Sequence, residues 1–413
     1  MENDYFRPEE TLFDITEKYP ETIPVFVSQG FEQLGDEGKR EKFGRSVSLK
    51  NAVFFKKINI DTFSNLLIET IEQKNDKSLT FLESEIDKSK KDSLKIEGLL
   101  PCPVRIPLTE ELEGFIGKYK EEKNYDIQYE LKAASMGLDW LKEILIDEED
   151  PKNLSDLFIS AGFDLFFDEK LMGKFKKRGV FKDFTSGQKM NTIFDNETIC
   201  LRDPESHYSM ISVVPAVFLV NKNELNGRKM PESWEDILKP EFENSISLPI
   251  GDFDLFNAIL LNINKKYGEK AIAALGRSLL ESMHPSQMVK SEKKKENRPA
   301  VTIMPYFFTK MTKGDGPMVA LWPKDGSIIS PIFMLSKADK VDKLKPVVDF
   351  FSSKEVGEIL AHRGLFPSTN PDVDNRIPEE NKFMWLGWDY IYSNDIAGLI
   401  TKCEDIFNNS IKG

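Results

Sequence analysis

The stretch that decides the fold is Leu99-Leu100-Pro101-Cys102-Pro103-Val104-Arg105-Ile106-Pro107. Prolines on both sides of Cys102 disfavour a helix there and bias the neighbouring residues toward extended backbone. From Thr109 to Tyr119, apolar residues then recur at helical spacing. A strand that ends in a constrained loop before a helix is where open α/β sheets place ligands. The stretch therefore predicts the first strand, loop and helix of a ligand-binding domain.

The same pattern is repeated twice in the next sixty or so residues. Residues 125–131 alternate like a strand and lead into a loop of small residues that contains Ser135 and Met136. Residues 156–159 form a strand that is apolar enough for a parallel sheet, and it ends in Ser160-Ala161-Gly162. Because such loops meet at one edge of the sheet, they offer backbone N–H groups to a ligand there.

The α/β pattern continues almost to the end of the chain. A short helix with a capping residue is predicted within 231–240, and further helices within 341–351, 353–362 and 385–407. The predicted strands are 213–220, 246–249, 301–304, 319–323 and 328–335. The second of these strands runs into Gly251 and Asp252, which extends the ligand-binding pattern to a second group of strands.

The first 73 residues read differently, as a small helical domain. Thr11 and Ser48 each stand where a residue capping a helix would stand. Residues 74–98 are rich in Lys, Asp, Glu and Ser, which is the composition of a linker. The predicted organisation is thus a helical domain at 1–73, a linker at 74–98 and an α/β domain at 99–413.

Composition limits the possible partners. The chain has 413 residues and a net charge of -13, which argues against non-specific nucleic-acid binding. Residues 1–8 do not resemble a signal peptide, and no apolar run is long enough for membrane insertion. A cytoplasmic location is therefore expected, or an extracytoplasmic one if a leader has been removed. The three cysteines and three histidines lack metal-ligand spacing, so neither a metal site nor another cofactor is expected.

Residues 99–413 resemble the type 2 periplasmic solute-binding proteins, in the broad group that includes ferric-iron-binding proteins. The matching segments are 160–164, 217–222, 231–240 with 246–249, and 323–338 with 348–353 and 364–367. The resemblance implies two α/β lobes joined by crossing strands, with a small ligand closed between them by hinge motion. By this analogy lobe one holds 99–206 and 326–413, and lobe two holds 207–325. The resemblance also implies an ABC-transporter permease or an intracellular protein as partner.

The N-terminal segment resembles a bacterial helical domain of unknown function that is related to the N-terminal module of iron-sulfur repair proteins. The match lies in 11–20, 23–26, 30–31 and 48–52. Many members of that family carry a Cys-x-x-Cys pair, but this chain has Gln33-Leu34-Gly35-Asp36 there. A docking or dimerising role is therefore preferred to a redox role.

The predicted solute is small, polar and anionic, or a metal complex. Direct chelation of ferric iron is not expected, because the paired tyrosines of the ferric-binding group are replaced by Tyr306-Phe307-Phe308. The predicted ligand-binding residues are Cys102, Arg105, Ser135, Met136, Ser160, Ala161, Gly162, Tyr208, Gly251, Asp252, His284 and Gln287. Arg105 could pair with a carboxylate or phosphate, and a surface role is equally open.

Two other functions remain open at this point. The cysteine between two prolines, Cys102, could act as a nucleophile, as in thiamin-degrading enzymes of the same fold, although buried cysteines are more often inert. An intracellular sensor whose N-terminal domain reports ligand binding is the third. The preferred prediction is a binding protein that is not an enzyme.

Overall fold

The computed structural model describes residues 5–23, 26, 31–35, 37–56, 60, 63–64, 67–68, 71, 93–101, 104–123, 125–133, 138–163, 165–250, 253–282, 297–311 and 316–411. Two compact units divide the chain, Met1–Leu82 and Glu83–Gly413. The division falls within the predicted linker.

The N-terminal unit is helical over its described residues. Its elements are α1 (Leu12–Lys18), η1 (Pro20–Thr22), η2 (Glu32–Gly35), α3 (Glu37–Gly44) and α4 (Leu49–Phe55). Both predicted caps are present, because Thr11 accepts a hydrogen bond from the Asp14 N–H and Ser48 accepts one from the Asn51 N–H. Leu12, Leu49, Phe26 and Phe63 belong to one buried core.

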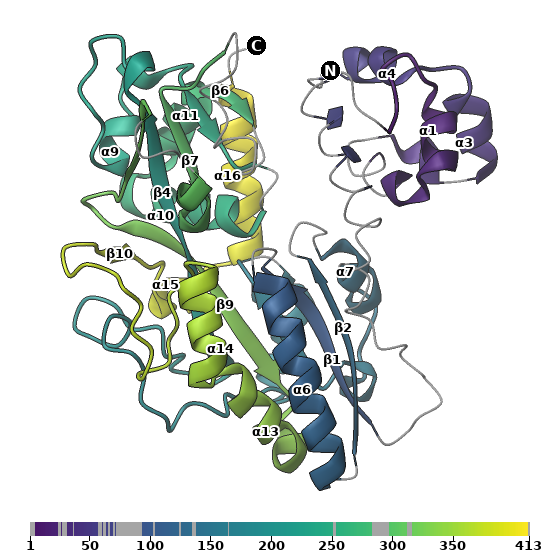
Figure 1. Ribbon diagram of the computed structural model, residues 1–413, viewed down its shortest axis with the longest axis vertical. Helices are drawn as coiled ribbons and strands as arrows, with labels where there is room; N and C mark the ends of the chain where they lie inside the picture. The colour runs from purple at the N-terminus through teal and green to yellow at the C-terminus, as the bar shows by residue number, and fades with distance from the viewer. Residues whose placement is uncertain are drawn as a thin grey trace. The chain divides into compact units, whose positions relative to one another are not determined.

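The second unit is built on one ten-stranded sheet with the order β2-β1-β3-β9-β4-β7-β5-β6, in which β10 also pairs with β9 and β8 with β4 (Figure 1). The strands are β1 (Ser93–Leu100), β2 (Asp126–Ala133), β3 (Leu157–Ala161), β4 (Tyr208–Asn221), β5 (Ile246–Leu248), β6 (Leu279–Ser282), β7 (Val301–Pro305), β8 (Met318–Leu321), β9 (Ser327–Ser336) and β10 (Phe383–Met384). We call β1, β2 and β3 with their helices lobe one, and β5, β6, β7 and β8 with theirs lobe two. The long strands β4 and β9 are shared by both lobes.

Helices cover the sheet in both lobes. The α-helices are α6 (Arg105–Lys123), α7 (Asp139–Leu145), α8 (Lys174–Lys177), α9 (Trp234–Ile237), α10 (Phe253–Tyr267), α11 (Glu269–Ser278), α13 (Val341–Phe351), α14 (Lys354–Glu358), α15 (Trp388–Ser393) and α16 (Ile396–Ser410). Shorter helical turns are η5 (Pro151–Asn153), η6 (Leu165–Phe167), η7 (Glu169–Gly173), η8 (Lys222–Glu224), η9 (Pro240–Phe242), η11 (Tyr306–Met311), η12 (Ala338–Lys340) and η13 (Ile359–Arg363). In lobe one, α6 and α13 lie together, with Phe115 stacked on Phe350 at 4.7 Å between ring centroids.

Two predicted boundaries are corrected by the structure. β1 begins at Ser93, so the last residues of the predicted linker are part of the sheet. The segment 326–413 was predicted to lie wholly in lobe one, but α16 packs against α10 and α11 of lobe two. The reason is its apolar stripe of Ile396, Ile400, Cys403 and Phe407, which is buried, with Phe407 against Phe256 of α10.

Candidate functional site

The strand ends of the two lobes meet along the shared strands. In lobe one, β1 pairs in parallel with β2 and β3, so their carboxyl ends share one edge. In lobe two, β5 and β7 are parallel in the same way. Ala161, the last residue of β3, lies opposite Ile332 of β9, which lies opposite Ser212 of β4. Pro305, the last residue of β7, lies opposite Ala216 of β4.

These registers fix the spacing of the two edges. Ser212 and Ala216 are four residues apart on β4, which is about 13 Å at roughly 3.3 Å per residue. Two parallel groups of strands thus direct their carboxyl ends toward one another over a span suited to a small molecule. We call this region, formed by the ends of β1, β2, β3, β5 and β7, the strand-end site.

On the lobe-one side, β3 ends in a tight turn. Gly162 has a φ of +91°, and its N–H donates to the carbonyl oxygen of Pro331 at 2.9 Å. That positive φ favours glycine. The next residue, Phe163, is fully buried and stacks on the half-buried Trp385 at 5.5 Å. The turn is therefore anchored to the shared strand on one side and to an aromatic pair on the other.

On the lobe-two side, β7 leads directly into aromatic residues. Tyr306 contacts the ring of Trp322 edge-on at 5.3 Å, and both are partly buried against a small core that contains Met304. Among the described residues, no group of three or more His, Cys, Asp or Glu side chains could hold a metal ion.

Two long helices begin at the strand-end site. α6 starts at Arg105, shortly after β1, and has 19 residues. α10 starts at Phe253, shortly after β5, and has 15 residues. The first turn of each helix carries backbone N–H groups without intrahelical partners and the positive end of the helix dipole. This arrangement suits a ligand with negative charge.

Only some of the predicted ligand-binding residues lie in the part of the chain that the structure describes. Ser160, Ala161 and Gly162 lie together at the end of β3. The side chain of Ser160 is fully buried, and its hydroxyl donates a long hydrogen bond of 3.4 Å to the carbonyl oxygen of Ala161. The backbone of Arg105 opens α6. Seven predicted residues lie outside the described part of the chain, namely Cys102, Ser135, Met136, Gly251, Asp252, His284 and Gln287.

The prediction that Tyr208 binds the ligand is corrected. Its side chain is 1% exposed, its ring stacks on Phe167 at 4.7 Å, and its hydroxyl donates to the carbonyl oxygen of Phe166 at 2.8 Å. The hydroxyl also accepts a hydrogen bond from Lys176 at 2.9 Å. Tyr208 is a core residue of lobe one, because both hydrogen-bonding positions of its hydroxyl are occupied by protein.

A separate polar pocket lies beside Tyr208. It measures about 550 Å³ and is lined by Glu169, Lys176, Lys177, Glu205, His207, Tyr392, Ser393, Asn394 and Asp395. Burial lowers the pKa of Lys176, while Glu169 at 3.4 Å opposes that shift. Burial alone would raise the pKa of Glu169, but Lys177 and Lys176 hold it below its usual value. Since these charges are paired with one another, the pocket is a structural ion-pair network of lobe one.

Trp385 has a property that its place at the start of the predicted helix 385–407 does not suggest. Its indole N–H is buried and has no hydrogen-bond partner among the described residues, although the ring lies on Phe163 beside the strand-end site. Buried donors normally have a partner. The indole N–H of the buried Trp388 also lacks a partner among these residues, so what distinguishes Trp385 is its place against Phe163.

Comparison with known families supports this geometry. Residues 152–394, more than half of the chain, match the family described as bacterial extracellular solute-binding proteins. Residues 6–63 match a domain of unknown function, DUF1858. The first match covers β3, the shared strands β4 and β9, and all of the strands of lobe two.

Solved structures of the same fold have little sequence identity with this chain. The ferric binding protein of Campylobacter jejuni is 15% identical, with a TM-score of 0.53, and the alignment covers 77% of this chain and 99% of that one. AfuA of Actinobacillus pleuropneumoniae, with fructose-6-phosphate bound, is 16% identical, with a TM-score of 0.51 and coverage of 77% and 99%. Iron-bound HitA of Pseudomonas aeruginosa is 9% identical, with a TM-score of 0.52 and coverage of 76% and 99%.

Other comparisons add less. No significant match to this sequence was found among curated proteins. Within the described residues, no helix combines the length and apolar character needed to cross a bilayer. The matched family is one of solute-binding proteins, which favours a binding protein over the alternative of Cys102 as a nucleophile. On the family match and the two-lobed fold, the chain belongs to the bacterial extracellular solute-binding proteins.

Proposed function

We propose that this protein captures a small anionic solute at the strand-end site and closes its two lobes over it. The observation that carries the proposal is the register of the shared strands, which sets the ends of β3 and β7 about 13 Å apart on one ribbon. The same two strands, β4 and β9, are the natural hinge, because they are the sheet connection between the lobes.

The proposed charge of the solute rests on the two helix starts. α6 and α10 each begin at the strand-end site, one from each lobe, so both dipoles favour an anion there. Arg105 would supply a bidentate cation, and Trp385 an unpaired indole N–H. Cys102, Ser135, Met136, Gly251, Asp252, His284 and Gln287 stay as proposed contacts. Similar structures include one with a sugar phosphate and one with iron, which supports anions and metal complexes as the classes to try.

The partner follows from the family rather than from a surface of this protein. Solute-binding proteins deliver their ligand to a transporter, so we infer an ABC-type permease as the receiver of the closed form. An intracellular receiver that senses the closed form is the alternative, and the N-terminal unit would then contact it.

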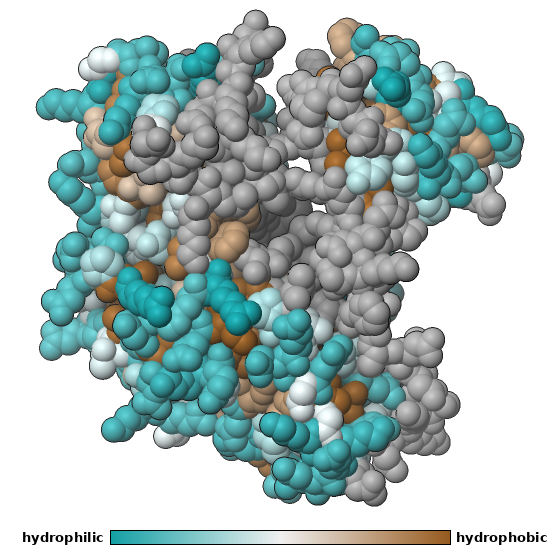
Figure 2. Space-filling view, in the orientation of Figure 1, coloured by the Kyte–Doolittle hydropathy of each residue, from teal (hydrophilic) through white to brown (hydrophobic). Residues whose placement is uncertain are grey.

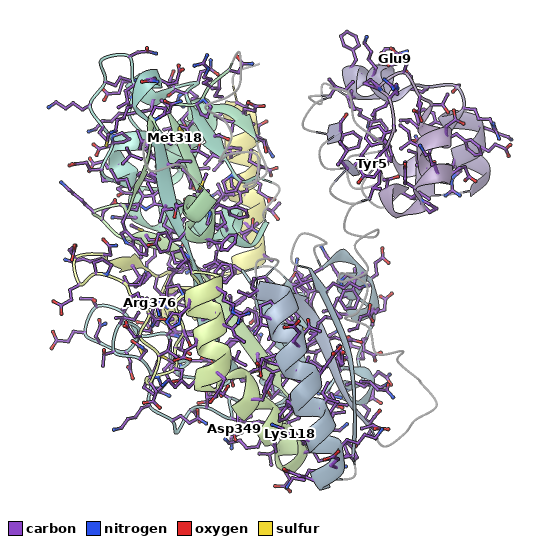
Figure 3. The ribbon with its side chains drawn as sticks, viewed as in Figure 1. Tyr5, Glu9, Lys118, Met318, Asp349 and Arg376 are labelled. Carbon is purple, nitrogen blue, oxygen red and sulfur yellow. The ribbon has the colours of Figure 1, made fainter. Side chains whose placement is uncertain are left out.

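A thermal-unfolding screen tests the proposal. Full-length protein is heated with phosphate, sulfate, sugar phosphates, dicarboxylates, amino acids and metal citrates. A ligand should raise the Tm progressively with its concentration, by an amount set by its affinity. Arg105→Gln should abolish the shift for an anion, whereas Lys118→Gln removes the same charge from the exposed surface of α6, further along that helix, and should not (Figure 3).

Two results would contradict the proposal. One is a ligand whose shift is equal in the two variants, because charge at the start of α6 would then be irrelevant. The other is a screen in which no anion or metal complex changes the Tm.

A further inference from the structure

A short segment around β10 lies between the two edges of the strand-end site. β10 pairs with β9 at Ser327 and Ile328, whereas the end of β3 lies opposite Ile332 of the same strand. Ile332 comes four residues after Ile328, which is about 13 Å along β9 at roughly 3.3 Å per residue. Trp385 directly follows β10 and stacks on Phe163, which comes shortly after β3. Trp385 therefore lies between β10 and the end of β3.

The same segment contacts lobe two through aromatic rings. Phe383 of β10 meets the ring of Trp322 edge to face at 5.3 Å between centroids. Trp322 meets the ring of Tyr306 in the same way at 5.3 Å, and Tyr306 follows the last residue of β7. Aromatic side chains thus run from the end of β3 to the end of β7. We call four of them, Trp385, Phe383, Trp322 and Tyr306, the aromatic row.

The aromatic row is partly open to solvent. All four of its side chains are half-buried, whereas Phe163 is fully buried. Figure 2 shows brown surface that interrupts the teal at the level of β10 and α15. The indole N–H of Trp322 already donates to the carbonyl oxygen of Lys382 at 2.6 Å, so Trp322 offers a ligand its ring rather than a hydrogen bond. The row therefore presents ring surface that a bound solute can cover.

Given that an anion is captured at the strand-end site, we propose that the solute carries a ring, which lies on the aromatic row while its charged group faces the starts of α6 and α10. A ring face gains free energy by covering aromatic surface, whereas an inorganic anion has no apolar group to place there. A cation could also bind aromatic rings, but it would meet the positive ends of two helix dipoles. The chemical class is thus a ring-bearing phosphate or carboxylate.

Trp385 is the residue of the row that should determine this preference most strongly. Its ring is held on one side by Phe163 and meets Trp388 edge to face at 5.8 Å. A ring that packing already holds in place loses little conformational freedom when a ligand covers it.

Another stacked aromatic pair provides a contrast. Phe350 of α13 is also half-buried and stacks on Phe115 of α6 at 4.7 Å. Its neighbour Asp349 lies at the far end of lobe one from β10 (Figures 1 and 3). Phe350 therefore offers a half-buried ring of the same kind away from the strand-end site.

The test measures dissociation constants by isothermal titration calorimetry with the full-length protein. The phosphate probes are phenyl phosphate, glucose 6-phosphate and glycerol 3-phosphate, and the carboxylate probes are benzoate and acetate. Within each set only the last compound lacks a ring. We expect at least one ring-bearing probe to bind about tenfold more tightly than the ring-free probe of its set. Phenyl phosphate and glucose 6-phosphate then distinguish an aromatic ring from a sugar ring.

The ratio of the two affinities separates ring contact from any loss of anion affinity that both probes share. Trp385→Leu should bring this ratio close to one, whereas Trp385→Phe keeps a ring and should retain most of the preference. Tyr306→Leu should lower the ratio from the lobe-two side, and it tests the same row if Trp385→Leu does not fold. Phe350→Leu is the matched control and should leave the ratio unchanged.

Three results would overturn the assignment of a ring. Equal binding of ring-bearing and ring-free probes by the wild type would do so while leaving capture of an anion intact. A ratio that neither Trp385→Leu nor Tyr306→Leu changes would show that the ring binds elsewhere. Absence of binding by all five compounds would contradict both the ring and the capture of an anion.

Discussion

Asp156 and Lys337 form a buried ion pair, and we predict that removing the carboxylate destabilises the protein more than removing the ammonium. The two side chains are 3% and 5% exposed, and Lys337 Nζ lies 3.3 Å from Asp156 Oδ1. Asp156 also accepts from Lys340 at 2.7 Å and from the backbone N–H of Lys95 at 3.0 Å. Lys337 has one further acceptor, the carbonyl oxygen of Leu154 at 2.6 Å. The carboxylate therefore has alternative partners, whereas within the described part of the chain the ammonium forms an ion pair only with Asp156, and Asp339 acts on it from a longer distance.

The two single substitutions should consequently differ in cost. Asp156→Ala leaves a buried ammonium without its counter-charge, which costs about 3–5 kcal/mol. Lys337→Met leaves Asp156 bound to Lys340 and to the Lys95 N–H, so we expect a cost of about 1–2 kcal/mol. The double variant removes both charges and should be more stable than Asp156→Ala alone.

Urea unfolding followed by tryptophan fluorescence measures these costs. All five tryptophans lie beyond Glu83, so the signal reports on the second unit alone. Burial lowers the pKa of Lys337, and loss of Asp156 lowers it further, so the cost of Asp156→Ala should shrink in alkaline solution as the amine loses its proton. Equal costs for the two single variants, or a cost below about 1 kcal/mol for Asp156→Ala, would refute the reasoning.

Two further predictions concern local structure. Gly98 has a φ of +148°, and a Cβ there would lie 1.7 Å from the Ile159 carbonyl oxygen, so Gly98→Ala should cost about 2–4 kcal/mol in urea unfolding. Gly114→Ala, in open space on α6, should instead stabilise by up to about 1 kcal/mol, and a similar effect at both sites would contradict the strand geometry. Burial would raise the pKa of Asp236, but hydrogen bonds from Lys239, from the Glu232 N–H and from Ser233 lower it to about 2. The ionised Asp236 should therefore stabilise the folded protein fully above about pH 4, and this contribution should vanish as the pH falls toward 2. Asp236→Asn should lower the free energy of unfolding by about 1 kcal/mol at neutral pH and leave it unchanged near pH 2. A cost that does not depend on pH would contradict this.

Local sequence patterns predicted much of the fold because they depend on near neighbours. The apolar runs at 246–249, 301–304 and 328–335 became β5, β7 and β9. The helix predicted within 231–240 begins with the capping box of Ser233 and Asp236. Each of these signals is complete within about ten residues, so no distant contact was needed to recognise it.

The misplaced elements depend on distant contacts. The first strand was assigned from Leu99 because the charged segment before it looks like a linker, although Leu94 and Ile96 already alternate with polar residues. Their burial requires β3, which is sixty residues away. Similarly, the lobe to which α16 belongs is decided by helices of lobe two that cover its apolar stripe. Tyr208 was assigned to the site from its position in the chain, whereas the aromatic residues around it decide that it is buried.

Hydrogen exchange with and without the solute tests the central claim most directly. Once the thermal screen supplies a ligand, the account predicts simultaneous protection of two separate groups of peptides. One group spans the ends of β1 and β3 with the start of α6, and the other spans the ends of β5 and β7 with the start of α10. Protection confined to one lobe, to the N-terminal unit or to the polar pocket beside Tyr208 would contradict capture between the lobes.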